Sequence, residues 1–173
     1  MTTLTLADAK SYLGIKENVN DAEAPGFIAA AESAIEQRVG PLVVAEQTSV
    51  LRGSGTCDLA LPVCPVASVT SVTGKSGSTV TVDWVSERAG VLHFESALSE
   101  DYYTVVYNAG WAASAASVPV DLLLAVKELV RHLYRTQRGP IPAQGGQEAV
   151  GAAYALPNRV TQLLQPYMSP GFA

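Results

Sequence analysis

The chain contains few of the residues from which disulfide scaffolds, metal sites and membrane spans are built. Its 173 residues include two cysteines and two histidines, aromatic residues make up 7%, and no apolar run reaches the roughly 18 residues that a membrane span needs. Cys57 and Cys64 lack the second pair typical of a zinc site, although they could bridge each other on oxidation. The first residues lack the basic and apolar stretches of a secretion signal. These absences favour a soluble, cytoplasmic chain with reduced cysteines and no membrane partner.

Positive charge is also scarce. The chain has 11 lysines and arginines against 16 acidic residues, which gives a formal net charge of -5 and a pI near 4.9. Coating nucleic acid requires a concentrated positive face, so any contact with DNA must be local. Hydrophobic residues make up 48% of the chain, which is enough for the core of one domain.

Catalytic and metal-binding patterns are missing as well. His93 and His132 stand alone, without the second histidine or the carboxylate at i+4 that a helical metal site needs. The chain has no Gly-x-Ser-x-Gly elbow, and the stretch GKSG at 74–77 lacks the upstream glycine and the following helix of a phosphate loop. We therefore predict no catalytic, cofactor-binding or metal-binding residues, with an unrecognised hydrolase as the weaker alternative.

Capping signals and a period of 3.6 residues predict helices near the N-terminus. Thr5 and Asp8 form a variant of the capping box before a short helix that ends at Gly14. A second helix is predicted over 20–39, provided that Pro25 lies in its first turn.

Between about residues 46 and 107 the apolar period changes to two, and glycine, serine and proline interrupt it at short intervals. The pattern predicts a small antiparallel β region inserted between helices. Its strands are expected at Gln47–Arg52, Cys57–Leu61, Ala67–Thr73, Val80–Val85, Val91–Glu95 and Tyr102–Tyr107. Gly110 then lets the chain leave the last strand, and Trp111 is expected to cap the core.

The third predicted helix begins at Val118–Pro119, runs to about Gln137 and has two unlike sides. One side is apolar, and the other carries Lys127, Arg131, Arg135 and Arg138. This basic side is solvated, contacts DNA phosphates, or pairs with acids of a neighbouring subunit. The candidate acids lie near the first two helices and are Glu17, Asp21, Glu23, Glu32 and Glu36. A nonspecific DNA-binding module that uses the basic side of helix 119–138 is therefore an alternative function.

The C-terminal part of the chain is predicted to be tethered. Residues 139–156 are rich in Gly, Pro, Ala and Gln and have no usable period, which indicates a flexible linker. A short helix at Pro157–Gln165 and a tail follow, with the apolar residues Val160, Leu163, Leu164 and Tyr167. This segment either docks to another protein or folds back onto the core of its own chain.

The order of these parts is more specific than any one of them. The chain reads LADAKSYL at 6–13, EQRVG at 36–40, YTVVYNAGW at 103–111, HLY at 132–134 and ALPNRV at 155–160. In this order the segments resemble the head-to-tail adaptor proteins of long-tailed bacteriophages, also called head-completion or connector proteins. The resemblance covers nearly the whole chain.

The resemblance implies a structural protein of the virion neck that is present in the host cytoplasm during assembly. Family members form a ring, typically a dodecamer, beneath the portal protein. The ring extends the channel for packaged double-stranded DNA, helps to retain the genome and provides a platform for the next neck or tail completion protein. In the family the C-terminal segment reaches toward the portal. The resemblance thus implies portal docking by Val160, Leu163, Leu164 and Tyr167, while Lys127, Arg131, Arg135 and Arg138 face a neighbouring subunit or the channel.

The expected fold class is α+β, with a mainly α-helical adaptor core of three to four helices, an inserted small antiparallel β region and a flexible C-terminal arm. We expect a helical adaptor domain at 1–138 with the β insert at about 46–107. The flexible linker occupies 139–156, and the docking helix and tail occupy 157–173. No cofactor is expected.

Overall fold

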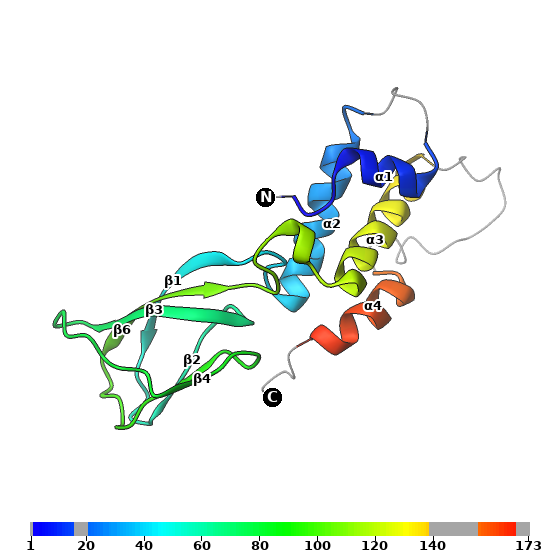
Figure 1. The fold of residues 1–173 in the computed structure, drawn as a ribbon. Helices are drawn as coiled ribbons and strands as arrows, with labels where there is room; N and C mark the ends of the chain where they lie inside the picture. The colour runs from blue at the N-terminus through cyan, green and yellow to red at the C-terminus, as the bar shows by residue number, and fades with distance from the viewer. Residues whose placement is uncertain (1, 16–20, 139–155, 169–173) are drawn as a thin grey trace. The chain divides into compact units, whose positions relative to one another are not determined.

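The computed structural model of the chain describes residues 2–15, 21–138 and 156–168 (Figure 1). Its helices are α1 (Leu6–Leu13), α2 (Ala24–Val39), α3 (Val120–Arg138) and α4 (Asn158–Leu164), with short 3₁₀ turns η1 (Ala115–Ser117) and η3 (Gln165–Tyr167). Its strands are β1 (Ala45–Arg52), β2 (Asp58–Ala60), β3 (Val66–Gly74), β4 (Trp84–Ser86), β5 (Val91–His93) and β6 (Tyr102–Ala109). The elements divide into two compact units: a helical unit, formed by the described residues up to 38 and from 119 to 168, and a β unit, Val39–Val118.

The structure corrects the predicted fold class. The sequence predicts a mainly α-helical core, whereas the described residues form four helices and two three-stranded antiparallel sheets, with about 38% helix and 26% strand. The fold is a mixed α+β fold and not mainly helical. The prediction is wrong because it treats the β region as an addition to a helical core, whereas that region buries a hydrophobic cluster of its own. The predicted linker at 139–156 lies outside the described residues, apart from residue 156.

The ends of α1 match the predicted capping signals. Thr5 Oγ1 accepts a hydrogen bond from the Asp8 amide at 3.1 Å, and Gly14 closes the helix in the left-handed conformation, at φ 71°. α2 begins at Ala24, later than predicted, and the residues just before it form a turn. Pro25 explains this start, because proline has no amide hydrogen and is tolerated in the first turn of a helix.

The helical unit is built around α3. α1 and α4 pack against it (Figure 1). The Phe27 ring of α2 meets the Tyr134 ring of α3 edge-on, with centroids 6.1 Å apart. The predicted apolar side of α3 is confirmed by the burial of Leu122, Ala125, Val126 and Leu129, while Leu133 is partly exposed. α4 adds Val160 and Leu164, which are fully buried. Burial of each of these leucine and valine side chains stabilises the unit by about 1.5–3 kcal/mol.

A buried carboxylate ties the N-terminal residues to α2. Glu32 is 7% exposed, and its Oε1 accepts hydrogen bonds from the Thr3 amide at 2.6 Å, the Thr3 hydroxyl at 2.5 Å and the Leu4 amide at 3.1 Å. These three donors compensate for the removal of the charge from water, which would otherwise make a buried acid costly. Glu32 therefore binds donors of its own chain in the interior and is not available to pair with a neighbouring subunit.

A second carboxylate joins three helices. The side chain of Glu128 in α3 is 16% exposed, and its oxygens lie 3.3 Å from Arg159 Nε of α4 and 3.9 Å from Arg131 Nη1. The Tyr12 hydroxyl of α1 forms a hydrogen bond with the same carboxylate. Burial raises the pKa of the Tyr12 phenol, and the hydrogen bond and charge of Glu128 raise it further. We call these four residues the Glu128 cluster.

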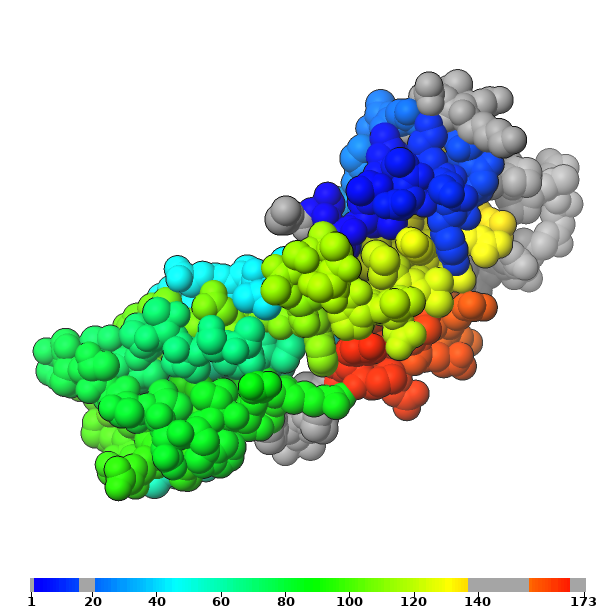
Figure 2. Space-filling model, in the orientation of Figure 1, coloured from blue at the N-terminus to red at the C-terminus, as the bar shows by residue number. Residues whose placement is uncertain are grey.

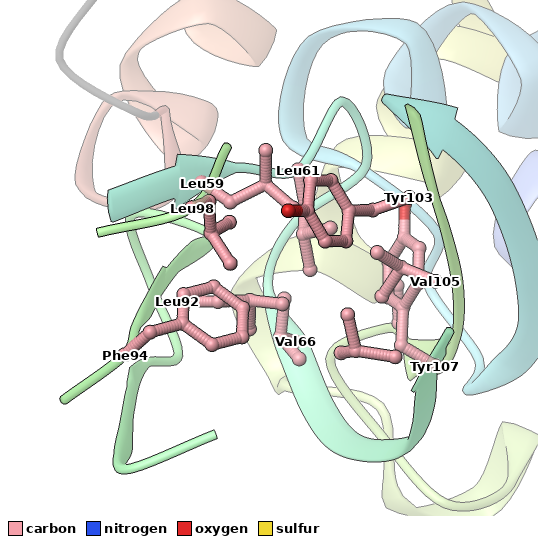
Figure 3. Close-up of a cluster of buried hydrophobic side chains, with 11 residues drawn as sticks. Leu59, Leu61, Val66, Leu92, Phe94, Leu98, Tyr103, Val105 and Tyr107 are labelled. Atoms are coloured by element: carbon pink, nitrogen blue, oxygen red, sulfur yellow. The ribbon is translucent and has the colours of Figure 1, made fainter. Parts of the chain in front are cut away.

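The β unit consists of two antiparallel sheets with one shared core. Their strand orders are β1-β6-β3 and β2-β5-β4. Alternate residues of β6 are buried, namely Tyr103, Val105 and Tyr107. Figure 3 shows Val105 of β6, from one sheet, and Leu92 of β5, from the other, turned toward the same interior space. The core of this unit is therefore filled from both sheets.

The predicted strands are confirmed, with ends that differ by one or two residues, except at 80–85. There the strand is limited to Trp84–Ser86. The preceding residues fold back on β3 instead, where the Val80 amide donates to the Val72 carbonyl at 2.9 Å. The tight turn after β3 accounts for this pairing, because it brings Thr79 directly opposite Thr73.

The chain leaves β6 through Gly110 and Trp111. Gly110 has φ 149°, and a Cβ at this position would lie 2.6 Å from Val44 Cα, so only glycine fits. Its amide donates to the Pro65 carbonyl at 2.9 Å, and Trp111 Nε1 donates to the Val39 carbonyl at 2.7 Å. These bonds fix the path by which the chain leaves the sheet.

Replacing Glu32 with alanine should lower the free energy of unfolding by about 3 kcal/mol, because the donors of Thr3 and Leu4 lose their charged acceptor in the interior. Urea unfolding followed by circular dichroism measures the change. Glu36→Ala is the matched control, since Glu36 is exposed one turn further along α2, and it should cost about 0.5 kcal/mol or less. Equal losses in the two variants would contradict the role of Glu32.

The raised pKa of Tyr12 predicts sensitivity of the helical unit to alkaline pH. Because the folded state holds the phenol proton more tightly, this contribution to stability is complete below about pH 10 and is lost as the pH rises through the folded pKa. Tyr12→Phe should therefore lose less stability than the native chain as the pH rises from about 10 to 12, measured as Tm against pH. Tyr102→Phe, at a residue that is 54% exposed, is the control for removing a phenol hydroxyl from the surface. A Tyr12→Phe curve parallel to the native one would refute the contribution of Tyr12.

Candidate interaction surfaces

The two histidines have different surroundings, and neither belongs to a metal-binding group among the described residues. His93 of β5 lies opposite Asp58 of β2, with Nδ1 2.7 Å from Oδ1, and its ring stacks on Trp84 of β4 at 5.1 Å. His132 of α3 has a buried Nε2 that lacks a hydrogen-bond partner in the described structure. Sequence spacing could not reveal the partners of His93, because they are set by the register of three strands.

The cysteines are unpaired. Cys57 and Cys64 are both free thiols and partly exposed. None of the helices within residues 2–15, 21–138 and 156–168 is long and apolar enough to span a membrane.

The predicted basic side of α3 is divided between two environments. The Lys127 ammonium lies 6.0 Å from the centroid of the Tyr12 ring, toward α1. Arg131 and Arg135 instead line an open groove beside α4. Arg138 is the last residue of α3, and its side chain falls outside the described part of the structure. The assignment of these four residues to a subunit or channel face stays a prediction.

The groove lies between α3 and the start of α4 and has a volume of about 320 Å³. Figure 2 shows the surfaces of the two helices, α3 in yellow and α4 in orange and red, side by side. Three guanidinium groups against one carboxylate make the groove positive, and guanidinium groups bind carboxylates and phosphates. We call it the arginine groove, and its lining residues are Glu128, Arg131, His132, Arg135, Pro157 and Arg159.

Four residues of this groove are not among the predicted site residues, namely Glu128, His132, Pro157 and Arg159. Glu128 follows Lys127 in a stretch dominated by bases, and Arg159 belongs to a different helix. Spacing rules for helices connect residues three or four apart and do not reach across helices. The sequence does offer one signal that could have drawn attention to Arg159, because it is the only charged residue after Glu148.

The structure places the predicted docking residues in two environments. Val160 and Leu164 are fully buried, whereas Leu163 and Tyr167 are partly exposed. α4 packs on α3, so the described segment adopts the alternative in which it folds onto its own chain. Portal docking stays a prediction, and without a rearrangement it can use only Leu163 and Tyr167 of that set.

Tyr167 is anchored to the first turn of α3. Its hydroxyl lies 3.5 Å from Asp121 Oδ2. Burial and then the negative charge of Asp121 raise the pKa of the Tyr167 phenol. The next residue, Met168, is 38% exposed and adds apolar surface beside α4.

Apolar side chains are also exposed on the β unit. Val50 of β1 is 63% exposed, and Trp84 of β4 is 51% exposed. Val50 is paired with Thr104 of β6, so both lie on the outward face of the sheet β1-β6-β3. Sequence reasoning did not single out these residues, although exposed apolar side chains are common at protein interfaces.

Solved structures of chains from gene transfer agent (GTA) particles share the fold. A chain from the neck of an empty GTA particle, computed with C6 symmetry, is 21% identical with a TM-score of 0.72, and the match covers 99% of this chain and 92% of that one. A chain from the virion of the native particle is 23% identical with a TM-score of 0.69, covering 99% and 92%. A chain from the neck of the native particle, computed with C12 symmetry, is 22% identical with a TM-score of 0.70, covering 99% and 91%.

The sequence matches a protein family over almost its full length. The family model is described as head completion protein, and it matches residues 2–169. A comparison with curated protein sequences gives no match. The family match spans every helix and strand of both units, which confirms the resemblance inferred from the order of the sequence segments. The chain therefore belongs to the head completion protein family.

Proposed function

We propose that the chain is a structural protein of the neck of a tailed, phage-like particle, where its copies form a ring between head and tail. The observation that carries this proposal is the family match over residues 2–169, because the family is named for a step of head assembly. The three structural relatives come from the neck or the virion of GTA particles, which supports the same location. The role is assembly and not the turnover of a substrate.

The ring is supported by the symmetry of the related necks, which were computed with C6 and C12 symmetry. In a cyclic ring, each copy presents one surface to the copy before it and a different surface to the copy after it. This chain offers unlike surfaces, because the arginine groove is positive while the whole chain carries a net charge of -5. Placed beneath the portal, such a ring extends the DNA channel, helps to retain the genome and forms a platform for the next neck or tail protein.

A nonspecific DNA-binding module is the alternative raised by the basic side of α3. Glu128 lies between the guanidinium groups of Arg131 and Arg159, and Lys127 lies against Tyr12. This side therefore does not present an unbroken row of cations to a line of phosphates. The structural role is better supported, and salt-sensitive binding of the isolated chain to duplex DNA would favour the alternative.

Particles assembled without this chain should fill their heads with DNA but should neither retain it nor acquire tails, because the head lacks its adaptor. Electron microscopy and quantification of packaged DNA in particles from a deletion strain measure both outcomes. Supplying the native chain from a plasmid is the control and should restore tailed particles. Tailed, DNA-filled particles from the deletion strain would refute the proposal.

The C-terminal helix can contact a portal while it stays in its described position. Leu163 and Tyr167 are its partly exposed apolar residues, whereas Val160 and Leu164 hold α4 to the helical unit. Docking through the exposed residues leaves the core intact. The proposed docking surface is therefore Leu163, Tyr167 and the adjacent Met168.

Leu163→Asp should weaken binding to purified portal rings at least about tenfold, because it would bring a charge into an apolar contact. Binding is measured by cosedimentation, with circular dichroism as a check that the helices are retained. Gln162→Asp is the matched control, since Gln162 is exposed on the same helix and is expected to have little effect. Native portal binding by a folded Leu163→Asp chain would exclude this docking surface.

A further inference from the structure

We propose that the arginine groove of one copy binds carboxylates of the β unit of the adjacent copy, through the acidic loop at residues 95–101. This inference rests on the ring of the proposed function and names the contact that joins its copies. The groove supplies guanidinium groups, and the loop supplies Glu95, Glu100 and Asp101. The partner is thus a second copy of this chain.

The groove has more positive charge than its own carboxylate can neutralise. Arg131 and Arg159 share Glu128, and their side chains are nevertheless 41% and 68% exposed. Arg135 is exposed and has no ion-pair partner among the described residues. An incoming carboxylate can therefore bind to Arg135 beside two guanidinium groups that already pair with Glu128, and the existing pairs reduce the entropy lost on binding.

His132 provides a second observation at the same place. It lines the groove, and its Nε2 is buried without a hydrogen-bond partner in the described structure. A buried polar atom without a hydrogen-bond partner is unfavourable. A small turn of the imidazole toward the groove would let an incoming acid complete this bond, so the groove favours a ligand with oxygen atoms.

The complementary charge lies on the β unit. Val39–Val118 contains seven acidic residues and three basic ones, which gives this unit a net charge of -4. The acids are Glu46, Asp58, Asp83, Glu87, Glu95, Glu100 and Asp101, and the bases are Arg52, Lys75 and Arg88. Most of the chain's net charge of -5 is therefore carried by the unit that does not contain the groove.

The acidic loop holds three of these acids within seven residues, between β5 and β6. All three are exposed. Glu100 pairs with Arg52 at 3.1 Å, but the two side chains are 71% and 61% exposed, and a pair so open to water contributes little. Its carboxylate can therefore exchange partners when a better site is offered.

A protein partner fits the groove better than DNA does. A volume of about 320 Å³ accommodates one or two side chains, whereas successive phosphates of a DNA strand need an unbroken row of cations, which Glu128 interrupts. A heterologous ring contact needs one surface of each sign on every copy, and the groove and the acidic loop supply both.

The contact can be tested in assembled necks with a zero-length carbodiimide, which links amines only to carboxylates in direct contact. Arg135→Lys introduces an amine into the groove, and mixing ¹⁵N-labelled with unlabelled chains distinguishes links between copies from links within one. Mass spectrometry should find the introduced lysine linked to the peptide that contains residues 95–101 of another copy. Thr136→Lys, at an exposed position outside the groove lining, is the matched control and should give at least about tenfold less of this product.

Charge reversal provides an independent readout. Arg131→Glu with Arg135→Glu should reduce the yield of tailed particles at least about tenfold, and adding Glu100→Arg with Asp101→Arg on the same chain should restore most of it. The inference would be overturned if the introduced lysine were linked only to its own copy, to the portal or to another peptide. Protection of DNA from nuclease by the groove would also overturn it. If the chain is found in necks but the link and the rescue are absent, the inference fails and the proposed function stands. If the chain is absent from necks, the proposed function fails.

Discussion

The arrangement of the helical unit depends on one carboxylate. Glu128 takes partners from α1, α3 and α4, and at 16% exposure its charge must be paired, because an unpaired buried charge costs several kcal/mol. Removing it would leave Arg131 and Arg159 repelling each other where two helices meet. The same pairing holds both guanidinium groups at the rim of the groove, so the interaction that stabilises the unit also determines what its surface can bind.

The two units have separate cores and different charges, and this separation suits a ring. The helical unit fills its interior around α3, while the β unit fills its own from two sheets. Because neither core uses the charged surfaces, those surfaces can serve contacts between copies without a loss of packing. A chain with a positive groove on one unit and a net charge of -4 on the other is suited to head-to-tail association.

Rules about neighbouring residues predicted the helices and strands of this chain, but they could not predict contacts between residues far apart in the sequence. The cap at Thr5, the stop at Gly14 and the alternation in β6 each depend on neighbours within a few residues. The partners of Glu32 lie 28 and 29 residues away, and Glu128 meets Arg159 on another helix. The fold class was wrong for a related reason, since spacing along the chain does not show whether strands close around a core of their own.

The burial of α4 sets an energetic condition on its use in docking. Releasing the helix would expose Val160 and Leu164, which costs about 3–6 kcal/mol at about 1.5–3 kcal/mol for each side chain, and would also break the pair between Arg159 and Glu128. A nanomolar complex has a binding free energy of about 12 kcal/mol, so release would consume a quarter to a half of it. Contacts made by Leu163 and Met168 in place carry no such cost. The packing of α4 therefore favours a portal that binds the helix on the surface of the unit over one that pulls it out.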